Sequence, residues 1–392
     1  MRDDLKAAVY GLTDELTGWR REFHRHPEVA YREVWTSAKL RSLLEGWGLP
    51  VEACAKTGLR AVLAGAGGGG PTVALRADMD ALPIEEEGDA PYRSLNPGAT
   101  HACAHDGHMA ILLAVAKVLA AREDGIKGRV VFLFQPSEER NPGGAKPMIE
   151  EGALDGVDAV FGLHLWQPLP TGTLGIVKGP MMAQPDDFTI VVRGKGGHGS
   201  MPHQAVDPIL AAAQLVVSLQ SIVSRNVDPL KPAVLSFGSV SGGTIYNVIP
   251  GEVSLTGTVR TFDPALQALI EGRMRAIIED TCRAFGATAE IRYQKGYPAL
   301  VNDVRMAEFV LKTARDVLGA DKATIIDPVM GGEDFAYYLQ KVPGAFWFFG
   351  AGDGRPHPHH HPAFDIDERA LAPAAFHMAS LVLDFLERGG KV

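Results

Sequence analysis

The stretch Thr100-His101-Ala102-Cys103-Ala104-His105-Asp106-Gly107-His108 carries three histidines, a cysteine and an aspartate. An apolar run, residues 109–121, follows directly and predicts a helix. Imidazole and thiolate groups are ligands that transition metals prefer, so their close spacing indicates a metal site. The alternative is a polar loop that caps the helix, with Asp106 as N-cap, but that leaves Cys103 and His105 unexplained. We interpret the stretch as a metal-binding loop.

The bulk composition narrows the class of protein. A chain of 392 residues is too long for one ordinary core, so two domains are expected. The net charge of −9 argues against a nucleic-acid partner. Three widely spaced cysteines, Cys54, Cys103 and Cys282, imply no disulfide framework and favour a cytoplasmic location. The chain start lacks the apolar core of a signal peptide, and no run reaches the roughly 18 apolar residues of a membrane span.

The regions on either side of the metal loop predict an α/β domain. Apolar residues from Leu5 to Phe23 recur with helical spacing. Short apolar runs predict strands, and the run at 129–134 is continuous, as in parallel strands buried on both faces. Strands that alternate with helices predict an open, mostly parallel sheet flanked by helices. The expected strands are 61–64, 72–77, 129–134, 159–163 and 345–349, and the later helices are 303–318 and 368–386.

Several polar residues directly follow these strands. Asp80, the pair Glu138-Glu139 and His164 would lie at the carboxyl ends of strands, where open α/β sheets bind their ligands. The alternative for the carboxylates is ordinary turn chemistry. Adjacent side chains at a strand end point in different directions, so one of the two glutamates can bind metal while the other serves as a general base.

The candidate ligands are too many for one tetrahedral zinc ion. Cys103, His105, Glu139, His164 and one of His359 to His361 make five. Five ligands suit two divalent metals about 4 Å apart, with the Cys103 thiolate as a bridge. Zinc fits this mixture best, and manganese, cobalt or nickel are plausible substitutes. The histidines near 360 could, by themselves, also form an exposed basic turn.

The pattern of apolar residues changes near Gln184, from continuous apolar runs to apolar and polar residues that alternate. Residues 184–295 read as β-α-β-β-α-β, which predicts an inserted α+β domain of ferredoxin-like type. The expected domains are therefore 1–183 with 296–392, which holds the metals, and 184–295, which serves as a lid and dimerisation domain. An open sheet edge is a common place for subunit pairing, so a homodimer or homotetramer is expected.

Six motifs occur in a fixed order along nearly the whole chain. Together they closely resemble the amidohydrolase branch of the aminoacylase and carboxypeptidase metallopeptidase family, which includes hippurate hydrolases, auxin-conjugate hydrolases and N-acetyl-diaminopimelate deacetylases. The motifs are Ala77-Asp78-Met79-Asp80-Ala81-Leu82-Pro83, the stretch His101 to His108, Gln135-Pro136-Ser137-Glu138-Glu139, Gly162-Leu163-His164, Gly197-His198-Gly199-Ser200-Met201-Pro202-His203 and Asn247-Val248-Ile249-Pro250.

The resemblance implies a role for each matching residue. Glu138 matches the general base, and Asp80 matches the aspartate that orients the metal site. His198 matches a histidine that reaches the partner subunit's active site. The implied metal ligands are Cys103, His105, Glu139, His164 and His360, the last from a His-x-Pro-x-aromatic pattern at 360–364; the implied substrate-carboxylate contacts are Asn247, Arg260, Gly331 and Gly332. One departure is Ala104, where the family usually has glycine.

The residues and the resemblance lead to the same expected reaction. This is hydrolysis of the amide bond of an N-acyl-amino acid, of the hippurate or N-acetyl type, to a carboxylic acid and a free amino acid. The metals would polarise the carbonyl and lower the pKa of water, and Glu138 would move the proton to the leaving amine. His198 would stabilise the oxyanion when the lid domain closes. A dipeptidase or carboxypeptidase of the same chemistry, and a non-catalytic metal-binding scaffold, are the alternatives.

Overall fold

The computed structural model describes residues 2–352, 354 and 356–392. The chain forms two compact units. The first contains residues up to 181, 301–328 and 334–392, and the second contains 182–300 and 329–333. The short segment 329–333, which carries Gly331 and Gly332, therefore groups with the second unit although its neighbours in sequence belong to the first.

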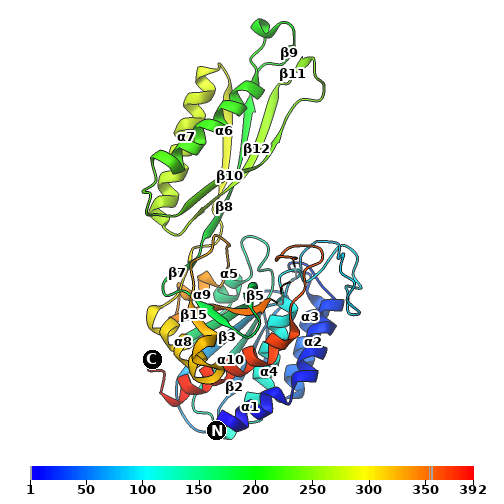
Figure 1. The fold of residues 1–392 in the computed structure, drawn as a ribbon, viewed down its shortest axis with the longest axis vertical. Coiled ribbons are helices and arrows are strands. Elements are labelled where there is room, and N and C mark those ends of the chain that lie inside the picture. Colours follow the sequence, from blue (N-terminus) through cyan, green and yellow to red (C-terminus); the bar gives the residue numbers. More distant parts are fainter. Residues whose placement is uncertain (1, 353, 355) are drawn as a thin grey trace. The chain divides into compact units, whose positions relative to one another are not determined.

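An eight-stranded sheet forms the centre of the first unit (Figure 1). Four pairings are parallel, namely β3 with β4, β3 with β5, β5 with β16, and β6 with β15, so the expected mostly parallel sheet is confirmed. The spatial order is β1-β2-β4-β3-β5-β16-β6-β15. The strands are β1 (Val51–Cys54), β2 (Gly58–Ala64), β3 (Thr72–Asp78), β4 (Arg129–Gln135), β5 (Ala159–Pro170), β6 (Leu174–Ile176), β15 (Ala323–Ile325) and β16 (Gly344–Gly352).

Helices flank this sheet. Apolar residues of α4 and α10 are buried almost throughout, and these two helices pack on each other and on β3. This packing places the first turn of α4 beside the carboxyl end of β3. The helices of the unit are α1 (Arg2–Tyr10), α2 (Thr13–Arg25), α3 (Val34–Gly46), α4 (His105–Ala120), α5 (Ala145–Glu150), α8 (Val304–Leu318), α9 (Ala336–Leu339) and α10 (Leu371–Glu387).

The single N-terminal helix expected over 5–23 is wrong, because the structure has α1 and α2 with a turn at Gly11 and Leu12. Glycine is a poor helix former. The hydroxyl of Thr13 donates to the carbonyl of Tyr10 at 2.6 Å and offers the backbone an alternative partner at the break. The apolar spacing survives the turn because both short helices face the same core.

The strand expected at 159–163 is longer than predicted, since β5 continues to Pro170. His164 therefore lies within a strand and not just after one. Pairing of Arg76 with Gly162 places His164 level with Asp78, the last residue of β3. The register of β5 against β3 thus places His164 at the edge of the sheet where β3 ends.

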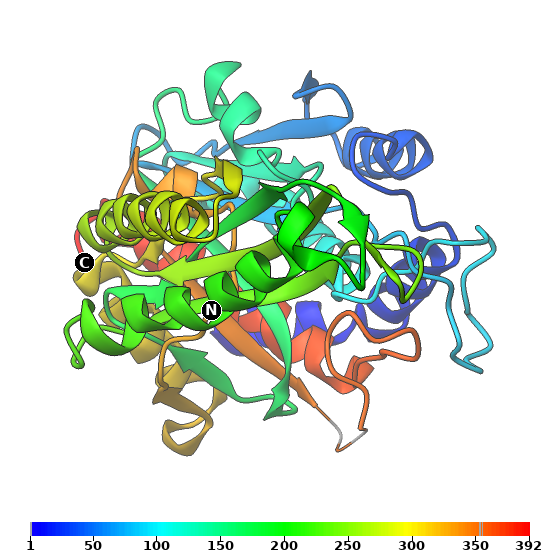
Figure 2. The same ribbon diagram turned by 90° about the horizontal axis from the view of Figure 1, so that it is seen from above.

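The second unit is a four-stranded antiparallel sheet in the order β10-β12-β8-β13. Helices α6 and α7 pack side by side on one face of this sheet (Figure 2). Each helix begins with a proline that directly follows an aspartate N-cap, at Asp207-Pro208 and Asp263-Pro264. The elements are β8 (Gln184–Arg193), α6 (Pro208–Arg225), β10 (Ala233–Ser241), β12 (Glu252–Thr261), α7 (Pro264–Ala284) and β13 (Thr288–Gln294), and they form the ferredoxin-like arrangement.

The described residues also form four short strands, β7, β9, β11 and β14. In the second unit, β9 (Gly197–His198) pairs with β11 (Val248–Ile249). The strands β7 (Pro180–Met182) and β14 (Leu300–Val301) lie where the chain passes between the units. By length and composition alone, two helical segments could cross a membrane, Pro208–Arg225 and Glu368–Glu387; the second is mostly buried inside the first unit, as core helices are.

Candidate metal centre

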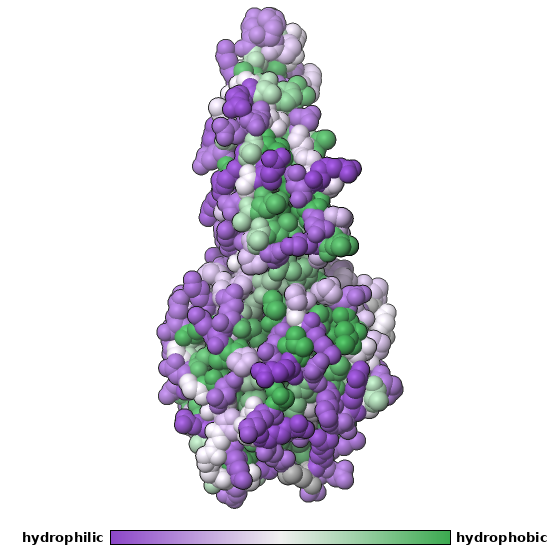
Figure 3. Space-filling view, turned by 90° about the vertical axis from the view of Figure 1, so that its left-hand side faces the viewer, coloured by the Kyte–Doolittle hydropathy of each residue, from purple (hydrophilic) through white to green (hydrophobic). Residues whose placement is uncertain are grey.

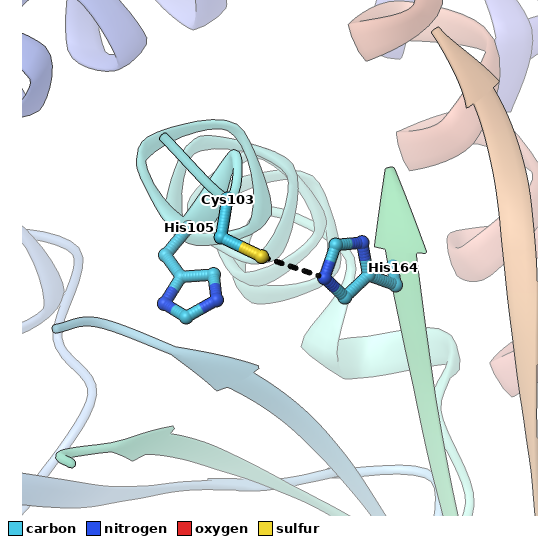
Figure 4. Close-up of side chains that lie close together, drawn as sticks. All are labelled: Cys103, His105 and His164. Carbon is cyan, nitrogen blue, oxygen red and sulfur yellow. Dashed lines mark hydrogen bonds between the residues drawn. The ribbon is translucent and has the colours of Figure 1, made fainter. Parts of the chain in front are cut away.

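Cys103, His105 and His164 converge at the start of α4 (Figure 4). Cys103 precedes the helix, His105 is its first residue, and His164 projects from β5. The Sγ atom of Cys103 lies 3.4 Å from Nε2 of His164. All three side chains are buried. The structure thus assembles three of the predicted ligands from two distant segments.

A second group of three shares the same cysteine. Cys103, Glu139 and His360 each offer a ligand atom within 4.8 Å of the others. The Nε2 atom of His360 lies 3.3 Å from Oε1 of Glu139. Cys103 belongs to both groups, so it would be shared if each group held a cation.

The ring tautomers direct lone pairs into this cluster. Nδ1 of His105 lies 2.8 Å from the backbone carbonyl of Asp80, and Nδ1 of His164 lies 2.7 Å from that of Leu165. A carbonyl only accepts, so each Nδ1 carries the hydrogen and each Nε2 keeps a lone pair. Among the described residues, Nε2 of His105 and Oε1 of Glu139 are buried without a hydrogen bond of good geometry. Buried atoms of this kind are what a metal ion would satisfy.

The local charge also favours cations. Burial raises the pKa of the Cys103 thiol well above its usual range, and the nearby Glu139 and Glu138 carboxylates raise it further. Burial lowers the pKa of His105, but Asp78, Asp80 and Glu139 outweigh burial and raise it to about 10. A divalent cation supplies the positive charge that would hold the thiolate and neutral imidazole needed for ligation. The donor set therefore suits two divalent metals.

Asp80 connects the ligands to the loop after β4. Its carboxylate accepts hydrogen bonds from the backbone N–H of Glu138 at 2.8 Å and of Glu139 at 3.1 Å. The backbone carbonyl of the same residue holds His105. Asp80 is buried and therefore fixes the orientation of both glutamates relative to the histidine.

The three candidate histidines near 360 differ in their contacts. His359 donates from Nε2 to the Leu165 carbonyl at 3.1 Å and stacks on Trp166. Nδ1 of His361 accepts from the N–H of Ala363 at 3.0 Å. His360 alone of the three belongs to the ligand group with Cys103 and Glu139. The geometry thus favours the residue that the motif indicated.

A further cluster, Asp78 with His105 and His108, has the spacing of a metal site, but other protein groups already satisfy Asp78 and His108. Arg76 forms an ion pair with Asp78 at 2.7 Å, so the negative charge of Asp78 is already balanced. His108 donates from Nδ1 to Asp78 at 2.6 Å, and its Nε2 accepts the N–H of Leu165 at 2.8 Å. Both ring nitrogens are used, so His108 supports the strand that carries His164.

The alternative interpretation, in which Asp106 is the N-cap of the helix, is wrong. The N-cap position belongs to Ala104, and Asp106 lies in the first turn of α4. Its carboxylate instead pairs with Arg20 at 2.8 Å and with His24 at 2.7 Å, both from α2. These buried partners replace the local cap that the sequence suggested.

His24 of α2 lies between two carboxylates. Its Nδ1 faces Asp106, and its Nε2 lies 3.3 Å from Glu86. Burial and Arg20 lower the pKa of His24, but the hydrogen bonds to Asp106 and Glu86 outweigh them and raise it. Arg20 also binds Asp365 at 2.6 Å, on the segment that follows His360. Arg20 therefore ties together two segments that carry ligands.

The remaining predicted residues belong to the second unit. His198 is exposed, and its Nδ1 accepts from the N–H of Ser200 at 3.1 Å. The hydrogen of a neutral His198 ring is thereby placed on Nε2, where it can donate. Asn247 is exposed in the loop before β11, and Arg260 is half-buried on β12. A side chain at Gly332 would meet the ring of Pro185 at 2.5 Å, so only glycine fits there.

An open α/β sheet that carries a buried cluster of candidate metal ligands beside a glutamate is typical of metal-dependent hydrolases. Residues 74–384 match the profile of Peptidase family M20/M25/M40, and the chain belongs to this family. It is 45% identical over 368 residues to the N-acetyl-L-cysteine deacetylase of Bacillus subtilis (strain 168), covering 93% of this chain and 86% of that protein. It is 47% identical to the N-acyl-L-amino acid amidohydrolase of Geobacillus stearothermophilus, covering 77% and 81%.

A solved structure agrees with these relatives. The YXEP protein of Bacillus subtilis, described as a dinuclear metal-binding peptidase from the M20 family, superposes with a TM-score of 0.82 at 37% identity. The match covers 96% of this chain and 99% of that one. The family resemblance expected from the six motifs is confirmed, and the chain is a hydrolase that acts on amides.

Proposed function

We propose that the protein hydrolyses N-acyl-amino acids, of the hippurate or N-acetyl type, to a carboxylic acid and a free amino acid. The observation that carries this proposal is the pair of ligand groups that share Cys103 beside Glu138. The named activities of the deacetylase and amidohydrolase relatives support the substrate class. The ligands in this proposal are Cys103, His105, Glu139, His164 and His360, and zinc suits their mixture of sulfur, nitrogen and oxygen best.

Two divalent cations, when bound, polarise the amide carbonyl and acidify water. Glu138 acts as the general base: it accepts the proton of the attacking water and returns it to the leaving amine. Its position supports this role, because Glu138 is buried next to the ligand Glu139 and its backbone is fixed by Asp80. Asp80 itself orients His105, Glu138 and Glu139.

Residues of the second unit complete the proposed site. His198 donates a hydrogen bond from Nε2 to the oxyanion. The N–H of Ser200 prepares His198 for this role, because it keeps Nδ1 as an acceptor and so leaves the hydrogen on Nε2. Asn247 and Arg260 bind the substrate carboxylate, with the backbone N–H groups of Gly331 and Gly332 as further donors. Closure of the lid would bring these donors to the reacting amide.

We further propose that the second unit pairs two subunits. Strand β10 is an edge strand of its sheet, and edge strands are ready templates for pairing. Exposed apolar side chains occur on the same unit, including Val217 of α6 and Val240 of β10. Figure 3 shows apolar surface among the polar side chains of this unit. A homodimer, or a tetramer built from such dimers, would cover them. The three cysteines are free and buried, which fits a reducing cytoplasm.

The deciding experiment is a hydrolysis panel on protein reconstituted with zinc, manganese, cobalt or nickel. Hippurate and several N-acetyl-amino acids are compared with dipeptides under the same conditions. We expect turnover of the N-acyl-amino acids. Activity confined to dipeptides would replace the substrate class with that of a dipeptidase or carboxypeptidase. Metal binding without hydrolysis of any amide would leave only the metal-binding scaffold.

A further inference from the structure

Glu33 is a fully buried carboxylate outside the proposed ligand set. Its Oε1 accepts from the backbone N–H of Tyr31 at 2.9 Å and from that of Ser137 at 3.0 Å. Its Oε2 accepts from the hydroxyl of Thr57 at 2.6 Å. Glu33 thus joins the segment before α3 to the loop after β4, 104 residues away.

Both backbone groups on Oε1 come from residues in the left-handed region. Tyr31 has φ 59° and Ser137 has φ 55°. Left-handed backbone costs a non-glycine residue roughly 1–2 kcal/mol, and such conformations persist only where the surroundings hold them. Oε1 of Glu33 accepts a hydrogen bond from both N–H groups. The hydrogen bond from Ser137 therefore stabilises its left-handed conformation.

The left-handed turn at Ser137 determines the directions of the backbone N–H groups of Glu138 and Glu139. The N–H groups of Ser137, Glu138 and Glu139 all point to carboxylates, the first to Glu33 and the next two to Asp80. Successive N–H groups that follow a left-handed residue form a concave anion site. Here that site is filled by the protein's own side chains, which hold the loop from both sides.

We propose that Glu33 is a positioning residue for Glu138: it fixes the turn at Ser137 and thereby the direction of the catalytic carboxylate. This inference rests on the proposed function, since it requires Glu138 to be the base. A displacement of about 1 Å in a reacting group can lower turnover by roughly a hundredfold, so a loosened turn is expected to act on kcat.

The obvious alternative is that Glu33 merely starts α3. A neighbouring glutamate already performs that task. The carboxylate of Glu28 accepts from the N–H of Trp35 at 3.1 Å and of Thr36 at 2.9 Å, in the first turn of α3. These hydrogen bonds of Glu28 hold the start of α3 and not the loop after β4, so Glu28 offers a matched control.

The test compares Glu33→Asp, Glu33→Gln and Glu28→Asp in the full-length, metal-loaded protein. Asp keeps the charge but is one methylene too short to reach both N–H groups, whereas Gln keeps the length and an acceptor oxygen. For Glu33→Asp we expect kcat to fall about ten- to a hundredfold, with KM within about twofold and the metal content unchanged. Glu33→Gln should keep kcat within about threefold of wild type, because most of the hydrogen bonds remain. Glu28→Asp should lower the melting temperature but not kcat.

Each outcome decides the matter. Equal loss of kcat in Glu33→Asp and Glu28→Asp, or a wild-type kcat in Glu33→Asp, overturns the inference while the proposed function stands. A wild-type protein that binds metal but hydrolyses nothing overturns both. Should Glu33→Asp fail to fold, Glu33→Gln takes its place as the test. Because glutamine keeps an acceptor for the N–H groups of Tyr31 and Ser137, about a hundredfold loss of kcat in folded, metal-loaded Glu33→Gln would defeat the inference.

Discussion

The Nδ1–H of His105 donates to the backbone carbonyl of Asp80 across 2.8 Å. The carboxylate of the same aspartate accepts the N–H groups of Glu138 and Glu139. One residue therefore sets the tautomer of a proposed ligand and the orientation of the proposed base. Because ligand and base are held by separate atoms of Asp80, their roles can be separated by mutation.

Glu138→Gln and His105→Ala are expected to differ in metal content. The first removes the base but no proposed ligand, so it should keep two metals per chain and lose about 10²- to 10⁴-fold in kcat. The second removes a lone pair from the cluster and should lose metal and turnover together. Elemental analysis beside the hydrolysis assay measures both. A fully active Glu138→Gln would refute the general-base role.

Ser200→Ala should weaken the oxyanion donor without removing it. The Ser200 hydroxyl lies 2.9 Å from Nδ1 of His198, and its loss leaves only the N–H contact to hold the tautomer. One hydrogen bond is worth about 1 kcal/mol, which corresponds to about a fivefold lower kcat. His198→Ala should lose far more. Ser218→Ala on α6 is the control, and a loss of the same size there would contradict the assignment.

Mixed subunits test whether His198 acts across the proposed dimer. His198→Ala and Glu138→Ala should each be inactive alone. After subunit exchange we expect about a quarter of wild-type activity, because half of randomly formed two-fold dimers are mixed and each has one complete site. Sedimentation or light scattering establishes the dimer first. Exchanged dimers without recovered activity would rule out action in trans.

Ala104→Gly should stabilise the protein. Ala104 has φ 66°, a left-handed conformation that costs alanine roughly 1–2 kcal/mol. Glycine adopts it freely but loses more entropy on folding, so we expect a net gain of about 0.5–1 kcal/mol in the free energy of unfolding. Ala110→Gly, inside α4, should instead cost about 1 kcal/mol. Denaturant titration compares them, and a destabilised Ala104→Gly would show that the methyl group contributes more by packing.

His377 should make stability sensitive to acid. Burial lowers the pKa of His377 from 6.5 to about 4 in the folded protein. Between these values the unfolded chain binds more protons, so the free energy of unfolding falls as the pH drops through this range. The full effect is roughly 3 kcal/mol by pH 4, and about 2 kcal/mol at pH 5.

The variant His377→Gln should show a flatter dependence of unfolding free energy on pH between 7 and 5. In the wild type, Nε2 of His377 lies 3.3 Å from the carbonyl of Val310. In the variant, the same carbonyl can accept a hydrogen bond from the glutamine side-chain amide. Exposed His203, changed to Gln, serves as the control. If both variants titrate like wild type, His377 is not the group responsible.

Much of the fold could be predicted because its signals are local. The continuous apolar run of β4 indicated a buried parallel strand, and the order of strands and helices in the second unit indicated a ferredoxin-like domain. The break at Gly11 was missed because the apolar spacing runs through it. The length of β5 was missed because its last residues are held by pairing with β16 and not by their own composition.

The partners of buried polar groups could not be predicted. Asp106 reads as a cap from its neighbours in sequence, but its charge is met by Arg20 and His24, more than 80 residues away. Glu33 has no motif, and its role appears only when Ser137 is brought against it. Such contacts depend on how helices dock, which no periodicity records.

Residue identity alone decides which side chains can ligate metal or move a proton, so the type of chemistry could be predicted from the sequence. Cys103, His105 and Glu138 could be named from it. Only folding decides which of these atoms meet: it gives two candidate ligand groups one shared cysteine, and it sets the tautomer of His105 through the carbonyl of Asp80 in the loop after β3. The reason is physical, because ligation and proton transfer act over a few ångströms while the chain separates the contributing residues by tens to hundreds of positions.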